Sequence, residues 1–251
     1  MRRKHFIACL FALIAALTGR TAVATEPLLI SYIEKPPYYY TDTQGAPKGF
    51  LIERIRQVMA EIRVDIRLEP RPPNRALQEL KVGSEPQCSL GWFRTTERES
   101  FAHFTLPLYF DRPLIAVAVP QRASELRKNG GLAALLALPG VRVGAVAGYS
   151  YGDAVDRQLA AVGEQVDRAP SPASNPAKLI AGRFDFALIN SEELDHLMAQ
   201  SPDLGARIVR LELPDVPPGK ARHLMCSRNV DAGLIERLDQ AITRLRFDRG
   251  R

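Results

Sequence analysis

Short apolar runs alternate with amphipathic stretches along the chain. Residues 28–33 form an apolar run that stops before Pro36 and Pro37, which predicts a buried strand. Apolar side chains in residues 50–62 then recur at helical spacing, and residues 64–68 alternate as in a second strand. This order of strand, helix and strand predicts a parallel βαβ unit at the beginning of the fold.

The alternation continues toward the C-terminus and starts afresh in the middle of the chain. Near residue 141 a new series of strands and helices begins with its own turn, Gly148 to Gly152, which predicts a second lobe rather than one extended sheet. We therefore expect an α/β fold with two lobes, each a mostly parallel sheet flanked by helices. The other elements that the pattern predicts are strands at 88–90, 114–119, 141–147, 184–189, 208–213 and 224–225, and helices at 75–82, 132–138, 154–162, 177–181 and 232–245.

The first 24 residues have the pattern of a secretory signal peptide. Residues 2–4 are basic, Phe6 to Leu17 is apolar, and residues 22–24 form a small-residue cleavage site. The apolar run is shorter than the roughly 20 residues that a membrane span needs, so an uncleaved anchor is the less favoured alternative. We expect cleavage near Ala24 and export to the periplasm.

The charge gives no support for nucleic acid as a partner. The full chain has a formal net charge of +6, and the four basic residues of 1–24, with no acid beside them, leave +2 for the exported part. Nucleic-acid-binding proteins usually carry a clustered basic face. The histidines lack metal-ligand spacing, and the adjacent Glu192 and Glu193 are expected on a solvated helix face. The sequence predicts no metal site and, without a Walker or dinucleotide-binding motif, no cofactor.

Cys88 and Cys226 are the two cysteines that remain after export. Each lies in a short apolar run that resembles a strand, and neither belongs to a CxxC or metal-spaced cluster. An oxidising compartment permits a disulfide that would join the N-terminal and C-terminal parts of the chain. Two separate buried thiols are an equally weighted alternative, because a sequence does not supply the required Cβ geometry.

Aromatic and basic residues gather after two of the predicted strands. Gly91 to Arg98 contains two arginines together with Trp92 and Phe93, and residues 38–40 are three tyrosines. Ligands of open α/β sheets bind outside the carboxyl ends of the strands, so we expect both stretches at one crevice. Guanidinium groups and rings suit an anionic or planar small molecule. A surface loop with solvated arginines is the alternative for the second stretch.

The turn from Gly148 to Gly152 matches the G-x-S-x-G pattern of serine hydrolases. It lies between a predicted strand and a predicted helix, and Asp185 with His196 or His223 could complete a triad with Ser150. We favour a simpler interpretation, in which the turn is an anion-friendly helix start with free backbone N–H groups. A five-residue pattern with two glycines arises easily by chance, and the chain has no HGGG-like oxyanion segment upstream.

The order of these parts resembles the family 3 solute-binding proteins of ABC importers, which have the type II periplasmic fold. The resemblance extends from about Leu28 to Leu245 and rests on short pieces in a fixed order: Pro37-Tyr38, Gly49-Phe50, Leu80 to Gly83, Gly91 to Arg98 with Phe104, and Gly182 to Asp185. It implies two lobes joined by two crossing strands that close on a ligand without chemistry. The implied lobes are residues 25–112 with 215–251, and residues 113–214.

The resemblance also implies a role for individual residues. Arg98 matches the arginine that amino-acid binders use on the ligand carboxylate, and Gly148, Tyr149 and Ser150 match the helix start that donates to the same group. Tyr38 and Tyr39 match the aromatic wall, and we expect Trp92 beside them to pack against the ligand. Asn190 stands where family members usually have an acid for the ligand ammonium, and Phe93 stands where they have a serine or threonine. Since an amide and rings balance a buried positive charge poorly, a standard α-amino acid is not the expected ligand.

The sequence thus predicts a monomeric periplasmic solute-binding protein, without enzymatic activity, for a small ligand that carries a carboxylate or another anionic group. The resemblance implies an ABC permease as its partner. A ligand sensor that is read by a membrane protein is the first alternative, because fold does not settle function. A serine esterase that uses Ser150 is the less favoured second alternative.

Overall fold

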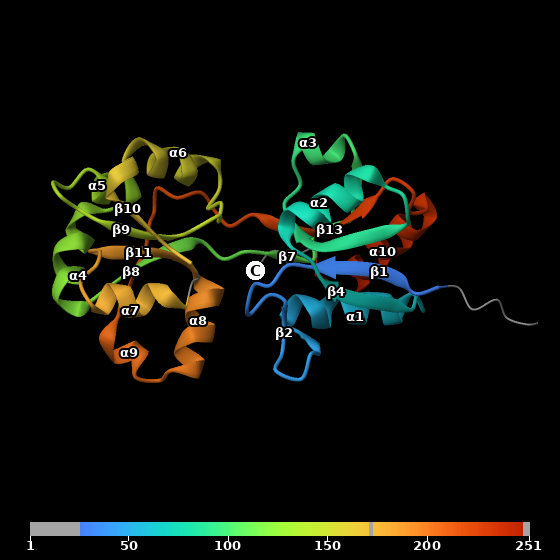
Figure 1. Ribbon diagram of the computed structural model, residues 1–251, viewed down its shortest axis with the longest axis horizontal. Coiled ribbons are helices and arrows are strands. Elements are labelled where there is room, and N and C mark those ends of the chain that lie inside the picture. The colour runs from blue at the N-terminus through green and yellow to red at the C-terminus, as the bar shows by residue number, and fades with distance from the viewer. Residues whose placement is uncertain (1–25, 171–172, 248–251) are drawn as a thin grey trace, which may run out of the picture.

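The computed structural model describes residues 26–170 and 173–247, which form two lobes side by side (Figure 1). Each lobe contains a β-sheet with helices on both faces, which confirms the predicted α/β fold with two lobes. The expectation of mostly parallel sheets is wrong, because both sheets are mixed. The expected signal peptide lies outside the described residues. Within those residues, no helix is long and apolar enough to cross a membrane.

The first lobe is built from the N-terminal part of the chain and from its last strand and helix. Its sheet has the order β4-β1-β5-β13-β6, and β7 also pairs with β13. β1 is parallel to β4 and β5, as the predicted βαβ unit requires, and β13 is antiparallel to its neighbours. The elements are β1 (Leu28–Tyr32), β2 (Tyr40–Thr41), β3 (Pro47–Lys48), α1 (Phe50–Glu61), β4 (Ile66–Pro70), α2 (Pro73–Val82), β5 (Gln87–Trp92), α3 (Thr96–Glu99), β6 (Ala102–Phe104), β7 (Tyr109–Phe110), β13 (Ala221–Ser227) and α10 (Ala232–Arg244).

The second lobe is built from the middle of the chain. Its sheet has the order β10-β9-β11-β8-β12, in which β9 is parallel to β10 and β11, and β8 is antiparallel to β11 and β12. The elements are β8 (Leu114–Ala118), α4 (Pro120–Leu126), the 3₁₀ helix η1 (Arg127–Asn129), α5 (Leu132–Leu136), β9 (Val143–Val146), α6 (Asp153–Ala161), the 3₁₀ helix η2 (Gly163–Gln165), β10 (Val166–Ala169), α7 (Ser174–Ile180), β11 (Phe186–Asn190), α8 (Ser191–Gln200), α9 (Leu204–Arg207) and β12 (Val209–Leu211).

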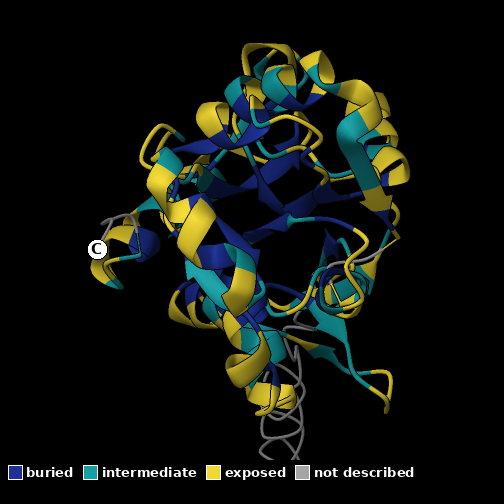
Figure 2. Ribbon diagram, turned by 90° about the vertical axis from the view of Figure 1, so that its left-hand side faces the viewer, coloured by how far each residue is buried: buried dark blue, intermediate teal, exposed yellow. Residues whose placement is uncertain are grey.

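Each sheet separates two apolar clusters because strand side chains alternate between its faces. In β13, Leu224 joins the cluster under α1 and α10, whereas Met225 joins the smaller cluster under α2. In β8, Ala116 faces α4 to α6, whereas Val117 faces α7 to α9. Figure 2 shows the buried strands between the more exposed helices. Burial of each large aliphatic side chain contributes about 1.5–3 kcal/mol to stability.

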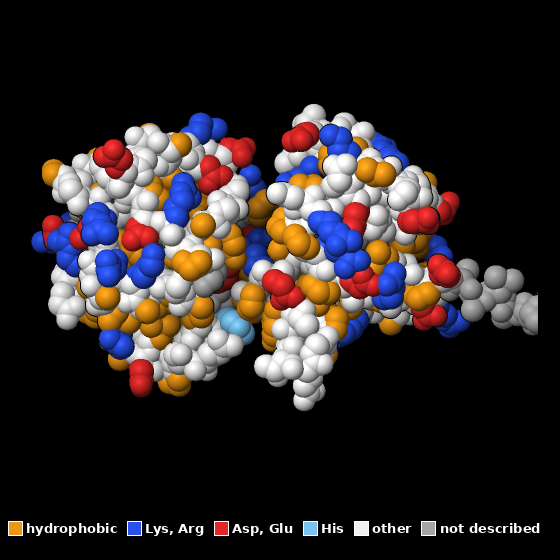
Figure 3. Space-filling view, viewed as in Figure 1, with side chains coloured by type: hydrophobic (Ala, Val, Ile, Leu, Met, Phe, Trp, Pro, Cys, Tyr) orange, Lys and Arg blue, Asp and Glu red, His pale blue; other side chains and the backbone are white. Residues whose placement is uncertain are grey.

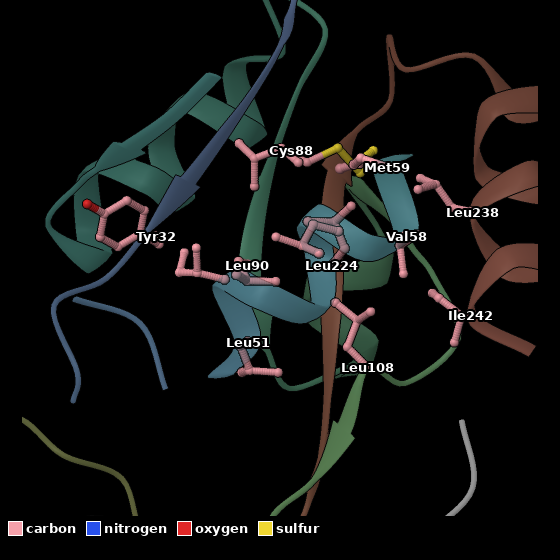
Figure 4. Packing of buried hydrophobic residues seen from close by; sticks show 14 of the residues in the cluster. Tyr32, Leu51, Val58, Met59, Cys88, Leu90, Leu108, Leu224, Leu238 and Ile242 are labelled. Atoms are coloured by element: carbon pink, nitrogen blue, oxygen red, sulfur yellow. A yellow bond between two sulfur atoms is a disulfide. The ribbon is translucent and has the colours of Figure 1, made fainter. Parts of the chain in front are cut away.

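A disulfide joins Cys88 of β5 to Cys226 of β13 within the first lobe, with the two sulfurs 2.05 Å apart. The cysteines are directly paired across the antiparallel strands, and Met59 and Leu238 belong to the same apolar cluster (Figure 4). The two cysteines are 138 residues apart in the sequence, and the whole second lobe lies between them. Of the two alternatives that the sequence leaves open, the structure has the disulfide.

The chain crosses between the lobes twice, and the crossings lie next to each other. The outward crossing lies between β7 and β8, and the return crossing lies between β12 and β13. A Cβ on Gly219 would lie only 1.8 Å from the carbonyl oxygen of Asp111. The close contact between the two crossings therefore requires a glycine at position 219. Asp215 accepts hydrogen bonds from the backbone N–H groups of Leu132 and Ala133 at the start of α5, which ties the return crossing to the second lobe.

Several predicted boundaries are wrong. The strand expected at 64–68 is β4, which begins at Ile66 and continues to Pro70 at the edge of the sheet, where proline is tolerated. The helix expected at 75–82 begins two residues earlier, at Pro73, with Pro72 as its N-cap instead of Asn74. The strand expected at 224–225, within the strand-like apolar run 223–227 that contains Cys226, is β13, which extends over 221–227 because it pairs with three other strands.

Candidate ligand-binding site

A cavity of about 340 Å³ lies between the two lobes, beside the crossing segments. The groove between the lobes is visible in Figure 3. The first lobe contributes Lys35, Phe93 and Arg222 to its wall. The second lobe and the crossing segments contribute Asp111, Arg112, Leu114, residues 150–155, Arg157, Asn190 and residues 216–220. A wider hollow of about 1330 Å³ contains none of the predicted ligand-binding residues. We therefore build the candidate site around the smaller cavity.

Arg222 forms the floor of the cavity on the side of the first lobe. Its guanidinium carbon lies 4.5 Å from the ring centre of Tyr38 and 4.7 Å from that of Phe93. Its Nε and Nη2 donate to the two carboxylate oxygens of Asp111 at 2.6 and 2.7 Å, the paired geometry that guanidinium and carboxylate groups favour. Burial raises the pKa of Asp111, and the attraction of Arg222 opposes this increase.

The tyrosines beneath Arg222 support it rather than face the cavity. Tyr38 and Tyr39 are 0% and 2% exposed, which places them in the core of the first lobe. The Nη1 of Arg222 donates to the hydroxyl of Tyr39 and to the carbonyl of Gly91. A Cβ at Gly91, which has φ 85°, would lie 2.4 Å from the ring of Tyr39. Glycine is therefore required at this strand end, and the two tyrosines contact Arg222 instead of lining the cavity.

Lys35 reaches from the first lobe to the second. Its Nζ lies 3.2 Å from Oε1 of Glu193 and 3.9 Å from the ring centre of Tyr149, and its side chain is only 14% exposed. Burial lowers the pKa of Lys35, although the carboxylate of Glu193 opposes this decrease. Glu193 is 3% exposed and Glu192 is 6% exposed, so the expected solvated position of these two acids is wrong. They lie at the start of α8, which faces the first lobe at this point.

The turn before α6 forms the opposite wall. The Oγ of Ser150 donates to Asp156 at 2.6 Å and accepts from the backbone N–H of Gly152. The backbone N–H of Tyr151 donates to Asp156 as well, so a carboxylate of α6 organises the turn. Asn190 precedes α8, and its backbone N–H donates to Glu193 at 3.4 Å.

The residues of the alternative catalytic triad do not meet. Asp185 accepts hydrogen bonds from Arg122, and the ring of His196 lies beside Gln200. His223 has its Nδ1 2.8 Å from the carbonyl oxygen of Thr105 in the first lobe. The Ser150 hydroxyl is bonded to Asp156 instead of a histidine. The predicted triad is therefore wrong for this structure, because its members are held by separate parts of the fold.

The predicted site residues separate into two groups. Phe93, Ser150 and Asn190 line the cavity, whereas Trp92 is buried in the cluster under α2 and donates to Ser89. Arg98 lies above the indole of Trp92, with its guanidinium carbon 4.8 Å from the ring centre. Its Nη1 donates to the carbonyl of Phe93, and no other side-chain hydrogen bond of Arg98 is seen among residues 26–170 and 173–247. The contacts of Arg98, Gly148 and Tyr149 with a ligand remain predictions.

Sequence reasoning missed Lys35, Asp111 and Arg222. The partners of Arg222 in the chain are more than one hundred residues away, so no local pattern could identify the pair. Lys35 directly precedes two prolines, and this break in the strand was the available sign that its side chain leaves the sheet. In the described part of the chain, no group of three or more His, Cys, Asp or Glu residues could hold a metal ion.

Comparison with known proteins agrees with this geometry. Residues 29–249 match the model of the bacterial extracellular solute-binding proteins, family 3. A histidine kinase sensor domain with similarity to periplasmic binding proteins has 20% identity and a TM-score of 0.64, with 88% of this chain and 90% of that chain covered. An ancestral arginine-binding protein bound to arginine has 18% identity and a TM-score of 0.65, with 89% and 94% covered.

The arginine-, lysine-, histidine-binding protein ArtJ from Geobacillus stearothermophilus has 17% identity and a TM-score of 0.66, with 88% of this chain and 89% of that chain covered. At these identities the neighbours establish the two-lobed fold and leave the ligand open. A comparison with curated protein sequences gives no match.

Proposed function

Because this chain belongs to the family 3 bacterial extracellular solute-binding proteins, we propose that it captures a small ligand with a carboxylate or another anionic group in the cavity between its lobes. The protein acts in the periplasm after loss of residues 1–24 and delivers its ligand to an ABC-type permease. It works as a monomer and needs no cofactor. The family and its structural neighbours are binding proteins, which supports a role without catalysis.

The charge of the cavity wall is the observation that carries this proposal. Five cationic side chains line the cavity together with the carboxylates of Asp111 and Asp153, and two of the five, Lys35 and Arg112, pair with acids outside the lining. Asp111 is already paired with Arg222, and Lys220 is only loosely paired, with its Nζ 3.9 Å from Asp153. The Nζ of Lys220 also lies 5.6 Å from the ring centre of Phe93, so a cation and an aromatic face meet at the cavity. Such a wall favours an anion with an apolar or planar body.

The ligand charge would then be opposite to that of the arginine bound by the ancestral neighbour. Asn190 supports this difference, because its amide carries no charge to neutralise a ligand ammonium. Arg98 has donors left for a carboxylate next to Phe93, as the resemblance implies. Ser150 and the backbone N–H groups of its turn complete the contact from the second lobe.

Isothermal titration with small carboxylic acids, each compared with its own amide, tests the proposal. We expect at least one acid to bind and its amide to bind at least tenfold more weakly, because charged hydrogen bonds contribute about 1.5–3 kcal/mol. In Arg98→Ala the affinity for that acid should fall by a similar factor. Arg94→Ala is the matched control, since Arg94 lies in the same loop with an exposed side chain paired with Glu99. Equal binding of acids and amides would contradict the proposal.

A sensor role is the second candidate, and the similarity to a histidine kinase sensor domain favours it. The two roles use the same closure on a ligand and differ in the membrane partner that reads it. The genes next to the coding sequence separate them. Permease and ATPase genes would support import, whereas a gene for a kinase or a cyclase would support sensing.

A further inference from the structure

Lys35 occupies a site whose composition is that of an ammonium-binding pocket. The Nζ of Lys35 lies against one carboxylate oxygen of Glu193 and over the face of Tyr149, with the ring centre of Tyr38 5.5 Å away. A carboxylate with aromatic faces is the combination that proteins use to hold organic ammonium ions. Here the ammonium comes from the protein itself and bridges the two lobes.

The parts of this pocket are fixed independently of Lys35. Glu193 accepts from the backbone N–H of Asn190 and from the hydroxyl of Tyr149, so α8 and the turn before α6 hold its carboxylate. The main chain of Lys35 is held by Tyr39, whose carbonyl accepts from the Lys35 N–H at 2.8 Å. The side chain of Lys35 thus places an ammonium group in a pocket that other residues hold in position.

Because Glu193 is buried, its carboxylate needs a positive partner in the pocket. Glu193 is 3% exposed, and a buried carboxylate without a positive partner is strongly disfavoured. Asn190 and Tyr149 can donate hydrogen bonds to it but cannot neutralise it. The other cation at this side of the cleft, Arg222, is taken by Asp111. Only Lys35 balances Glu193 among the described residues.

We propose that Lys35 determines specificity by filling an ammonium subsite of the cleft from within, so that ligands with their own positive group are excluded. This inference rests on the proposed function in one respect only, that the same cleft receives the ligand. Its consequence is that the loss of the lysine side chain creates a site for a small organic ammonium ion. In the intact protein, Lys35 occupies the ammonium subsite before any ligand enters the cleft.

Complementation of a truncated lysine by propylammonium tests the proposal. By isothermal titration, Lys35→Ala should bind propylammonium at least about tenfold more tightly than the intact protein, as expected for a desolvated cation over aromatic faces. Propanol and propionate, which have the same chain without the positive charge, should show no such gain. Glu193→Gln added to Lys35→Ala should abolish the gain. Lys48→Ala is the matched control, because Lys48 is an exposed lysine of the same lobe.

A second variant protects the test against a failure to fold. Lys35→Ser opens the same space with a polar side chain, and near-UV circular dichroism establishes whether either variant is folded. If folded Lys35→Ala or Lys35→Ser binds propylammonium no better than the intact protein, or binds propanol equally well, the proposal is wrong. That outcome would leave the binding of carboxylic acids by the intact protein unaffected, so it is distinct from a failure of the proposed function.

Discussion

The two lobes contribute different groups to the cleft. The first lobe contributes Lys35 and Arg222 with the rings around them. The second contributes the buried acids at the start of α8 and the backbone turn before α6. Each lobe therefore carries groups that are best neutralised when the other is near, as in the contact of Lys35 with Glu193. The contact between the lobes and the proposed choice of ligand therefore involve the same few charges.

The lobes also differ in how they are held together internally. The first lobe has a disulfide in its core and, close to the cleft, the buried ion pair of Arg222 with Asp111. The apolar clusters of the second lobe contain mainly aliphatic side chains and alanines around Phe184 and Phe186. We expect the first lobe to depend on this disulfide and this ion pair in addition to its apolar clusters, and the second to depend mainly on apolar contacts.

Removal of Asp111 should have the largest effect on stability. Asp111→Ala leaves the guanidinium of Arg222 buried without a negative partner, with only the neutral acceptors on Tyr39 and Gly91, at a cost of about 3–5 kcal/mol in the free energy of unfolding. Guanidinium chloride unfolding measures this cost. Asp195→Ala is the control, because Asp195 pairs with Arg112 and Arg210 where all three side chains are 38–46% exposed. Its cost should stay below about 1 kcal/mol. Equal costs would show that burial does not distinguish the two ion pairs.

Removal of the disulfide should have the next largest effect. The double variant Cys88→Ala, Cys226→Ala frees the unfolded chain from a long closed loop, which should lower the free energy of unfolding by about 2–4 kcal/mol. Hydrogen exchange should show the loss in β5 and β13 more strongly than in β9 and β11. An equal loss of protection in both lobes would contradict the contrast between them.

The periodic elements of both lobes could be predicted from the sequence because their signal is local. α1 and α10 each have an apolar stripe at helical spacing, and their predicted limits differ from the structure by one residue at the C-terminal end. β13 was harder to predict, because its length depends on pairing with β5, β6 and β7 rather than on its own apolar run. Pairing between distant strands leaves little trace in a single segment.

The candidate site was predictable only in part. Phe93, Ser150 and Asn190 line the cavity, and each follows a strand end or precedes a helix, positions that the sequence pattern can locate. The ion pair of Arg222 with Asp111 joins residues that are far apart in the chain. The bridge from Lys35 to Glu193 depends on how the lobes meet, and no local pattern contains that information.

A pair of helix caps gives the smallest and most closely matched test of the two lobes. Asp231 caps α10 of the first lobe by accepting from the backbone N–H of Leu234 at 3.0 Å. Asp215 caps α5 of the second lobe by accepting from Leu132 and Ala133 at 2.7 and 2.9 Å. Loss of either cap by substitution with alanine should cost about 1 kcal/mol. Asparagine should retain most of the effect at Asp231, which is the N-cap residue of α10, but only part of it at Asp215, because both carboxylate oxygens accept there and an amide has one acceptor oxygen.

Hydrogen exchange shows in which lobe each cap substitution lowers stability. Asp231→Ala should increase exchange in α10, and Asp215→Ala in α5, while the other lobe keeps its protection if the lobes unfold as separate units. Asp215 lies on the return crossing, so its loss also frees the chain segment that leads back to the first lobe. If Asp215→Ala increased exchange equally in β5 and β13, the crossing would couple the lobes, and the internal bonds of the first lobe would not act alone.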